Sequence, residues 1–427
     1  MNSMMLKLIN LIKGKLFQNL GMYTLVNFIN SAIPFLLLPI LTSNLSEAEY
    51  GIVDIFNNLS FIFIPIIGLN IVSCVLRFYY DDNIDFNKFL STVTTTLLIC
   101  GTIIILAVAA FIYSTDVHII NEEIPNSVLL LALLFAFSSQ IIEIILGIFR
   151  ATERPLNYGL VRIVKTGLDL SLSIYCVVVL KLGWEGRIYP AVGVGLLIAL
   201  LILLYLFYAY NVRLVIKKDY LRIAFKYSTP LIFHSLAGYI ISFSDRFIIL
   251  EYMSADDVGL YAVAYQVGMI MSFVNNSFNQ AWTPYVFSIL KGGDLSKIKQ
   301  LSKFNYYYFL LMIVMALGIF LMVPLIYEWF IDGKFEVDYQ IVFWVLLGYA
   351  FNGMYKILVN YLFYYKKTQK LSYITIFSAV LNIGLCLYLV PRMGILGAAI
   401  STTIAFLSMF IFVAIDYYKL KNIEKTY

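Results

Sequence analysis

Charged side chains occur inside several long apolar stretches of this chain. Six of them lie a helical turn or more from the nearer end of their stretch: Asp54, Glu143, Asp169, Asp245, Arg246 and Lys356. A charge inside a membrane is costly, so each is a candidate for function. The two cations could bind an anionic group such as phosphate or pyrophosphate. The four carboxylates could carry a coupling H⁺ or Na⁺, or they could balance the basic residues electrostatically.

Polar residues also repeat at helical spacing along these stretches. Within residues 227–250, Gly238, Ser242, Asp245 and Arg246 fall in one arc at 100° per residue. At least five apolar stretches carry such a stripe, which favours a hydrated cavity between helices. The alternative for Asp245 and Arg246 is structural pairing with neighbouring helices. Each would then need its own partner, because adjacent residues do not face each other on a helix.

The basic residues favour an anionic substrate. Arg77 and Arg150 stand at the inner ends of stretches 50–78 and 127–149, and with Arg246 and Lys356 they would give the cavity a basic lining. Some basic residues at the inner ends simply follow the bias of cytoplasmic segments toward Lys and Arg. Lys165 lies four residues before Asp169, so those two could neutralise each other.

Cysteine and nucleotide-binding motifs give no sign of a metal site or a bound cofactor. Cys74, Cys100, Cys176 and Cys386 all lie in apolar runs, without the spacing of zinc ligands or of a disulfide framework. The phosphate-binding pattern GxxxxGK[ST] does not occur in the chain. We therefore expect no metal, no cofactor and no use of ATP by this chain.

Composition places the 427-residue chain among polytopic membrane proteins. Hydrophobic residues make up 61% and charged residues 13%, and mean hydropathy is +0.86. Soluble proteins carry about 25% charged residues. The net charge of +5 is too small to indicate nucleic acid as a partner, and the basic residues are not gathered in one patch. The apolar stretches are continuous runs of about 20 residues, which predicts spanning helices.

The sequence predicts twelve spanning helices in two parallel six-helix bundles around a central cavity. Their expected bounds are 20–42, 50–78, 89–113, 127–149, 158–181, 188–211, 227–250, 258–289, 305–327, 338–364, 371–391 and 394–416. Of the 30 Lys and Arg residues, 24 then fall on the side of the N-terminus and four on the other side. That bias predicts cytoplasmic termini. Residues 1–19 read as a basic amphipathic helix on the inner membrane surface.

An internal repeat supports the division into halves. Leu45-Ser46-Glu47-Ala48-Glu49-Tyr50-Gly51 resembles Met253-Ser254-Ala255-Asp256-Asp257-Val258-Gly259, at an offset of 208 residues. The offset corresponds to six predicted helices, and an even number of spans gives both copies the same orientation in the membrane. The halves of some transporters are related in this way, by an axis along the membrane normal. The expected domains are residues 1–213, with the amphipathic helix, and residues 214–427.

Three segments carry a resemblance to a known family. They are Pro39-Ile40-Leu41-Thr42 with the first repeat copy, Asp245-Arg246-Phe247-Ile248-Ile249-Leu250 with Val258-Gly259-Leu260-Tyr261-Ala262-Val263-Ala264-Tyr265, and Gly394-Ile395-Leu396-Gly397-Ala398-Ala399-Ile400-Ser401-Thr402-Thr403. Along the whole chain it resembles Wzx-type O-antigen and capsular polysaccharide repeat-unit flippases. These belong to the MOP exporter superfamily, which also contains the MATE drug exporters.

The resemblance implies a transporter, not an enzyme, of the bacterial inner membrane. Its substrate would be an undecaprenyl-pyrophosphate-linked oligosaccharide, moved by ion-coupled alternating access during O-antigen, lipopolysaccharide or capsule synthesis. Implied partners are membrane lipids, a polysaccharide polymerase and a chain-length regulator. In relatives, basic residues of the cavity bind the sugar-phosphate head group. By their positions, the resemblance assigns this contact to Arg246, Lys356, Arg77 and Arg150. Lipid II flippases of the superfamily have fourteen spans, which argues against that branch.

Two other functions stay open at this point. One is a MATE-like drug or metabolite exporter, which would have a smaller and more acidic cavity. The other is a membrane glycan polymerase, which would carry a large outer loop with catalytic Arg or His. The longest outer loop here has about 13 residues, which disfavours the polymerase.

The charge asymmetry yields a prediction about topology. Reporter fusions at Asn126 and Asp332 should read outside, and fusions at Lys218 and Lys367 should read inside. Alkaline phosphatase and fluorescent-protein activities at the four sites measure this. Inversion at two of the four sites would contradict the twelve-span arrangement.

Overall fold

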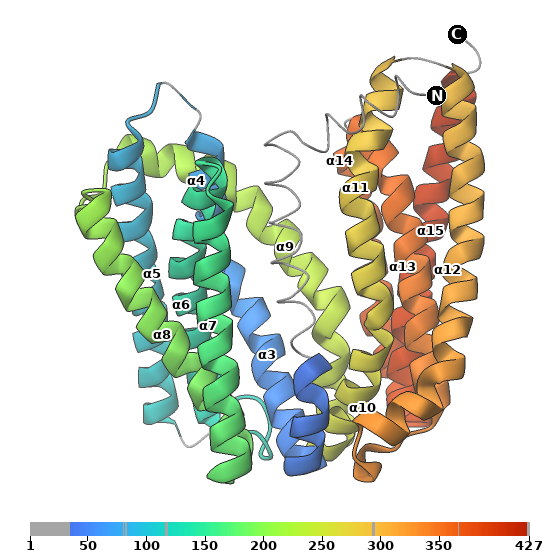
Figure 1. Cartoon of the computed structure of the whole chain (residues 1–427), viewed down its shortest axis with the longest axis horizontal. Coiled ribbons are helices and arrows are strands. Elements are labelled where there is room, and N and C mark those ends of the chain that lie inside the picture. The colour runs from blue at the N-terminus through green and yellow to red at the C-terminus, as the bar shows by residue number, and fades with distance from the viewer. Residues whose placement is uncertain are drawn as a thin grey trace. The chain divides into compact units, whose positions relative to one another are not determined.

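The chain folds into helices, as seen in a computed structural model that describes residues 35–79, 81, 83–115, 118–292, 295–365 and 367–424 (Figure 1). No strand occurs in these ranges. After a short apolar helix, Phe35–Asn44, the helices are α3 Glu47–Ile67, α4 Ser73–Phe78, α5 Phe86–Ser114, α6 Asn126–Ala151, α7 Pro155–Ile174, α8 Trp184–Ala209, α9 Lys218–Tyr252, α10 Ala255–Gly268, α11 Ile270–Gly292, α12 Leu295–Phe330, α13 Tyr339–Tyr364, α14 Thr368–Met393 and α15 Ile395–Glu424. The expected amphipathic helix and most of span 20–42 lie outside the described residues.

The remaining predicted spans match single helices or interrupted ones. The span 50–78 is divided into α3 and α4 by turns at residues 68–72, and 258–289 is α10 and α11, which meet at a bend of 41°. The helix α7 continues as a π-helix, Tyr175–Val179. Eight described helices are long and apolar enough to cross a membrane, or nine with the bent pair. An all-helical, multi-pass membrane protein is confirmed, while the number twelve stays a prediction.

The described chain forms two compact units, and three helices run from one into the other. The first unit contains residues 35–40 and 55–236, and the second contains residues 41–54 and 237–424, so the short helix Phe35–Asn44 enters the second unit after Ile40. The helix α3 therefore leaves the second unit after Asp54, and α9 enters it at Ala237. The division at residues 213 and 214 into two six-helix bundles stays a prediction.

The first unit is held together by an aliphatic core. Phe89 of α5, Leu133 and Ile144 of α6 and Leu206 of α8 are almost completely buried in one cluster. A close-packed interior of this kind gives the helices fixed positions. Polar side chains at the helix ends are thereby held on a rigid frame.

In the second unit, the two copies of the internal repeat each begin a helix. The Ser46 hydroxyl accepts a hydrogen bond from the Glu49 amide at 3.2 Å, and the Glu49 carboxylate accepts one from the Ser46 amide at 2.8 Å. At the start of α10, the Ser254 hydroxyl likewise accepts from the Asp257 amide at 3.2 Å. A serine with an acid three residues later satisfies the free amides of a helix start. Helix capping is therefore one physical reason for the repeat.

The two copies also pack directly against each other through their glycines. A Cβ atom on Gly51 would collide with the Ala255 carbonyl oxygen, and one on Gly259 would collide with the Glu47 carbonyl oxygen. Gly51 and Gly259 are equivalent positions of the repeat, and so are Glu47 and Ala255, because each pair is separated by 208 residues. Each contact is therefore the counterpart of the other. The starts of α3 and α10 thus approach each other symmetrically, at a distance that only glycine allows.

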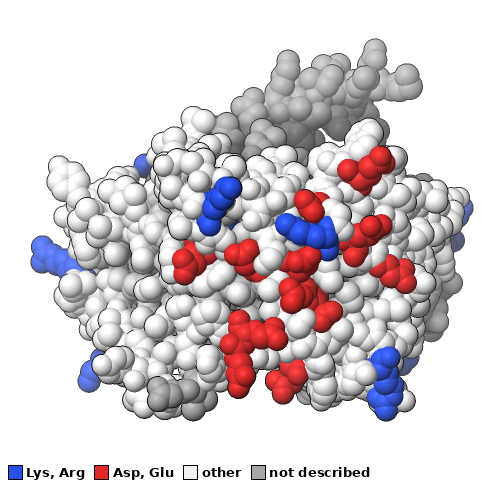
Figure 2. All heavy atoms as spheres, turned by 90° about the horizontal axis from the view of Figure 1, so that it is seen from below, with Lys and Arg blue, Asp and Glu red and all other residues white. Residues whose placement is uncertain are grey.

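Acidic side chains gather at the end of the molecule where α3 and α10 begin (Figure 2). In the second unit, the segments at this end contain nine acids and two basic residues, Lys334 and Arg392. The acids are Glu47, Glu49, Glu251, Asp256, Asp257, Glu328, Asp332, Glu336 and Asp338. A scarcity of Lys and Arg is typical of segments outside the cytoplasm. The orientation with cytoplasmic termini stays a prediction.

The glycine contact predicts a strong response to a single methyl group. Gly51→Ala and Gly259→Ala should each destabilise the protein by about 1–3 kcal/mol, because the helices must separate to admit the Cβ atom. Thermal unfolding in detergent, followed by size-exclusion chromatography, measures this. Gly318→Ala in α12 is the matched control, since a Cβ atom there meets no other atom within 4 Å. Equal stability of all three variants would contradict the contact.

Candidate functional site

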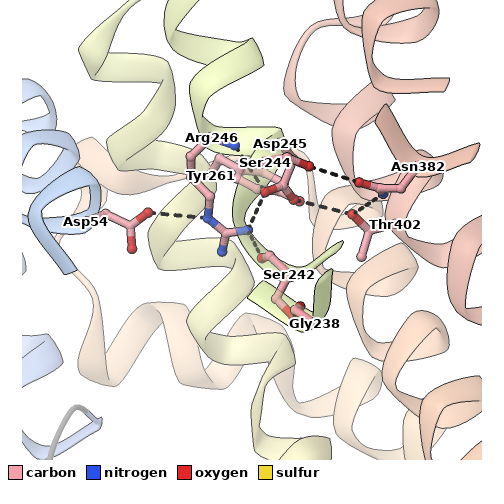
Figure 3. Close-up of polar contacts among 9 residues, drawn as sticks. All are labelled: Asp54, Gly238, Ser242, Ser244, Asp245, Arg246, Tyr261, Asn382 and Thr402. Atoms are coloured by element: carbon pink, nitrogen blue, oxygen red, sulfur yellow. Dashed lines mark hydrogen bonds and ion pairs between the residues drawn. The ribbon is translucent and has the colours of Figure 1, made fainter. Parts of the chain in front are cut away.

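The most buried charge cluster of the second unit is centred on Arg246 of α9 (Figure 3). Its guanidinium Nη1 lies 2.7 Å from Asp245 Oδ1, and its Nε lies 3.3 Å from Asp54 Oδ2 of α3. Nη1 also donates to the Ser242 carbonyl oxygen at 3.0 Å. The Arg246 side chain is 3% exposed and that of Asp245 is 0% exposed. One cation is therefore enclosed by two carboxylates.

Asp245 has hydrogen-bond donors from two further helices. The Tyr261 hydroxyl of α10 donates to Asp245 Oδ2 at 2.7 Å, and the Thr402 hydroxyl of α15 donates to the same oxygen at 3.3 Å. Asn382 of α14 donates to Thr402 at 3.3 Å and accepts from Ser244 at 3.3 Å. These contacts compensate the desolvation of a carboxylate that has no access to water.

Aromatic rings cover the other faces of the guanidinium. The Arg246 carbon Cζ lies 3.9 Å from the centroid of the Tyr265 ring and 5.0 Å from that of the Tyr261 ring. Cation–π contacts of this kind are worth up to about 2 kcal/mol in the absence of water. Arg246 thus connects α9 with α3 and α10.

The alternative of structural pairing with a neighbouring helix holds for Arg246, which pairs with Asp54 of α3, whereas Asp245 has no separate cationic partner among the described residues. The Arg246 side chain folds back along α9, so that its terminal nitrogen reaches the carboxylate of the preceding residue. A long, flexible side chain can do this even though neighbouring Cβ atoms diverge. Asp54 and Asp245 share this one cation.

The cluster unites two of the three segments on which the family resemblance rests. Asp245 and Arg246 come from the second segment, as do Tyr261 and Tyr265, and Thr402 comes from the third. The roles of Tyr261 and Thr402 were missed in the sequence. A buried acid and a buried arginine need hydrogen-bond partners. The occurrence of Tyr261 and Thr402 in the same set of segments as Asp245 and Arg246 was the signal that could have identified them as these partners.

Lys356 lies elsewhere in the second unit, on a polar seam between α11 and α13. Its Nζ donates to Asn276 Oδ1 at 2.6 Å, and no carboxylate of the described residues pairs with it. Farther along the seam, Asn360 donates to Asn279 at 2.8 Å and accepts from Thr283 at 3.0 Å. Asn276 is exposed, so the Lys356 amine lies beside an accessible surface. An amine without a counter-charge can bind an anion.

The first unit holds two further ion-pair groups. Glu143 of α6 lies 3.2 Å from Arg150 and 2.6 Å from Arg162 of α7. Asp169 of α7 lies 2.8 Å from Arg187 of α8, which also donates to Ser173 at 3.1 Å. Arg187 falls between the predicted spans 158–181 and 188–211, and its role was missed in the sequence.

Two other basic residues of the first unit have aromatic neighbours. Lys165 has its amine 5.1 Å from the centroid of the Phe135 ring, and its expected neutralisation of Asp169 is not a direct ion pair. Arg77 of α4 is exposed, and its guanidinium carbon lies 5.6 Å from the ring of the adjacent Phe78. Arg77 and Arg150 therefore retain accessible donors, whereas Arg246 does not.

Comparisons with known proteins agree with this architecture. The family described as Polysaccharide biosynthesis protein matches residues 16–290. Lsg locus putative protein 1 of Haemophilus influenzae is 23% identical over 399 residues, which cover 90% of this chain and 95% of that protein.

Several solved structures share the fold, two of them with TM-scores of 0.72 and 0.68. The lipid II flippase MurJ, in an inward closed conformation, aligns with a TM-score of 0.72 and 14% identity, covering 92% of this chain and 87% of that one. An inward-facing multidrug resistance MATE family transporter of the MOP superfamily aligns with a TM-score of 0.68 and 16% identity, covering 95% and 96%. The expected resemblance to the MOP superfamily is confirmed.

The burial of the Arg246 cluster predicts a large loss of stability on truncation. Arg246→Ala leaves two carboxylates without their cation and should cost about 3–5 kcal/mol, lowering both membrane abundance and thermal stability. Arg150→Ala removes a cation from an exposed ion pair and should cost about 0–1 kcal/mol.

A charge-matched variant makes the test specific. Arg246→Gln combined with Asp245→Asn and Asp54→Asn should recover part of the lost stability, because no buried charge is then left alone. Normal abundance and unchanged thermal unfolding of Arg246→Ala would contradict the structural role of this residue.

Proposed function

The chain belongs to the polysaccharide biosynthesis protein family, and on that premise we propose that it is a flippase for a lipid-linked glycan. It would move an undecaprenyl-pyrophosphate-linked oligosaccharide repeat unit from the inner to the outer leaflet of a bacterial inner membrane. The observation that carries the proposal is the family match over residues 16–290. The shared fold with the MurJ flippase and a MATE transporter supports a transporter of this class.

The proposed orientation has both termini in the cytoplasm. Support comes from the distribution of Lys and Arg along the chain and from the acidic segments at the opposite end of the second unit. A polysaccharide polymerase and a chain-length regulator are proposed to act on the glycan after it crosses.

Among the cations, Lys356 is the strongest proposed contact for the pyrophosphate. It lies inside α13, beside an exposed surface, and pairs with no carboxylate in the part of the chain that the structure describes. Arg77 and Arg150 are proposed as further contacts, because both are exposed. Arg246 is proposed to act on the substrate only in a conformation in which it exchanges a carboxylate for the anion. In the arrangement described above its donors are already occupied.

Transport of a defined substrate tests the proposal. Proteoliposomes containing the purified protein and an undecaprenyl-pyrophosphate-linked oligosaccharide should make the sugar accessible to an external lectin, while protein-free vesicles should not. A cationic dye should not be transported. Dye transport without glycan exposure would instead establish the alternative, a MATE-like drug or metabolite exporter.

Removing the Lys356 amine should affect transport and leave the fold intact. Lys356→Ala should lower glycan exposure about tenfold or more, because a hydrogen bond to a charged group contributes about 1.5–3 kcal/mol. Lys356→Arg should retain part of the activity. Lys370→Ala is the control, since Lys370 pairs with Asp416 and is 54% exposed. Full transport by Lys356→Ala at normal membrane abundance would refute the anion contact.

The carboxylates Asp54, Glu143, Asp169 and Asp245 are proposed as sites for a coupling ion. All four accept from an arginine in the structure, so ion binding would have to compete with those pairs. Amide replacements Asp54→Asn, Glu143→Gln and Asp169→Asn should each lower transport driven by an ion gradient. Vesicle transport that is unaffected by all three replacements would exclude a coupling role for these residues.

A further inference from the structure

A basic pocket lies at one end of the first unit, and none of its lining residues belongs to the ion-pair groups described above. It has a volume of about 370 Å³ and is lined by residues of the α5 start and of the α8–α9 connection: Asp85, Asn87, Lys88, Ser91, Asn211, Arg213, Val215 and Lys217. Its volume falls in the range of small-ligand sites, roughly 300–1,000 Å³. Neither the family nor the proposed transport reaction assigns it a role.

The wall of the pocket is built by hydrogen bonds that fix the α8–α9 connection on α5. The Arg213 amide donates to Ser91 Oγ at 3.1 Å, and the Lys217 amide donates to Thr92 Oγ1 at 3.2 Å. Thr95 donates to the Arg213 carbonyl oxygen at 3.4 Å. The backbone at residues 213 and 217 is thereby held in place, which leaves both basic side chains directed away from the core and exposed.

The pocket has a net positive charge. Lys88, Arg213 and Lys217 contribute three cations, and Asp85 contributes the one carboxylate. Asp85 caps α5 and pairs with Lys88, and the hydrogen bonds from Lys88 hold the pKa of Asp85 below its usual range. Asp85 therefore stays ionised and pairs with Lys88, while Arg213 and Lys217 form no ion pair with a carboxylate among the described residues. The Lys217 amine lies 5.9 Å from the centroid of the Tyr220 ring, and both cations are exposed and can reach a ligand.

The three residues between Arg213 and Lys217 are apolar and exposed. Leu214, Val215 and Ile216 are 66%, 49% and 40% exposed. Three consecutive exposed apolar residues are unfavourable in water and favourable in the interfacial region of a bilayer. Their neighbours Arg213 and Lys217 are then placed at the level of lipid head groups.

The end of the unit that carries the pocket is the basic one. Arg150 and Arg154 at the α6–α7 connection and Lys218 and Arg222 at the start of α9 belong to it, while Lys181 and Arg187 lie at the other end. Segments rich in Lys and Arg face the cytoplasm, where the leaflet carries anionic lipids. A lipid phosphate is therefore the anion most available to this pocket.

We propose that this pocket binds the phosphate group of an anionic phospholipid, with Arg213 and Lys217 contacting the head group and Leu214, Val215 and Ile216 inserted beside its acyl chains. The site is separate from the proposed flippase function and does not depend on it. Binding would hold the α8–α9 connection at the membrane surface.

Lipid binding to the purified full-length protein tests the proposal. Phosphatidylglycerol and phosphatidylcholine are added in mixed micelles, and binding is followed by native mass spectrometry and by thermal stabilisation. The two variants are R213Q/K217Q, which removes the pocket cations, and R222Q/K226Q, which removes two exposed cations of α9 that do not line the pocket. Size-exclusion profiles establish that each variant is folded.

The expected result is selective loss of phosphatidylglycerol binding. Each basic residue near an anionic surface contributes about 1 kcal/mol, so R213Q/K217Q should lose about 30-fold in affinity. The variant R222Q/K226Q should lose less than about threefold if the pocket, and not diffuse charge, binds the lipid. Phosphatidylcholine should bind all three proteins weakly.

Two results would overturn the proposal. Equal losses in both double variants would show diffuse attraction of a basic surface without a site. Stabilisation of the wild-type protein by glycerol 3-phosphate or inorganic phosphate to the same extent as by phosphatidylglycerol would identify a site for a soluble phosphate compound, and not for a lipid.

Discussion

The enclosed ion pairs of Arg246 dominate the organisation of the second unit. A guanidinium with 3% exposure can persist in a helix only if its charge and its donors are matched. Asp245, Asp54 and the Ser242 carbonyl provide the match, and Tyr261 and Thr402 complete the shell around Asp245. The positions of α3, α9, α10 and α15 relative to one another follow from satisfying these few polar atoms.

The location of this cluster gives it a further consequence. The helices α3 and α9 both pass from one compact unit to the other, at residues 54–55 and 236–237, as the short helix Phe35–Asn44 does at residues 40–41. The Asp54–Arg246 ion pair joins them inside the second unit. The cluster therefore fixes α3 to α9 close to the point at which α3 leaves the second unit.

The glycine contact between α3 and α10 complements the ion pairs. Gly51 and Gly259 bring two helix starts together closely enough to exclude any side chain, and the capping serines define where each helix begins. The internal repeat is therefore explained by local physics, in the form of caps and a close symmetric contact. In the first unit, the basic pocket arises in a comparable way, because Ser91 and Thr92 of α5 fix the connection that carries Arg213 and Lys217.

The sequence alone determined the class of the protein, because a long apolar run must close its own backbone hydrogen bonds in lipid and therefore forms a helix. Apolar length and Lys/Arg bias predicted the helices, and the segments containing Asp245, Tyr261 and Thr402 carried the family resemblance. Only the tertiary structure decided which charges pair. Helical periodicity gives the face of a residue but not the reach of its side chain, so the contacts of Arg246 with both Asp245 and Asp54 could not be foreseen. Likewise, Arg187 reaches Asp169 only because α7 and α8 pack together, and the partner of Lys356 among the described residues is the amide of Asn276 in α11, not a carboxylate.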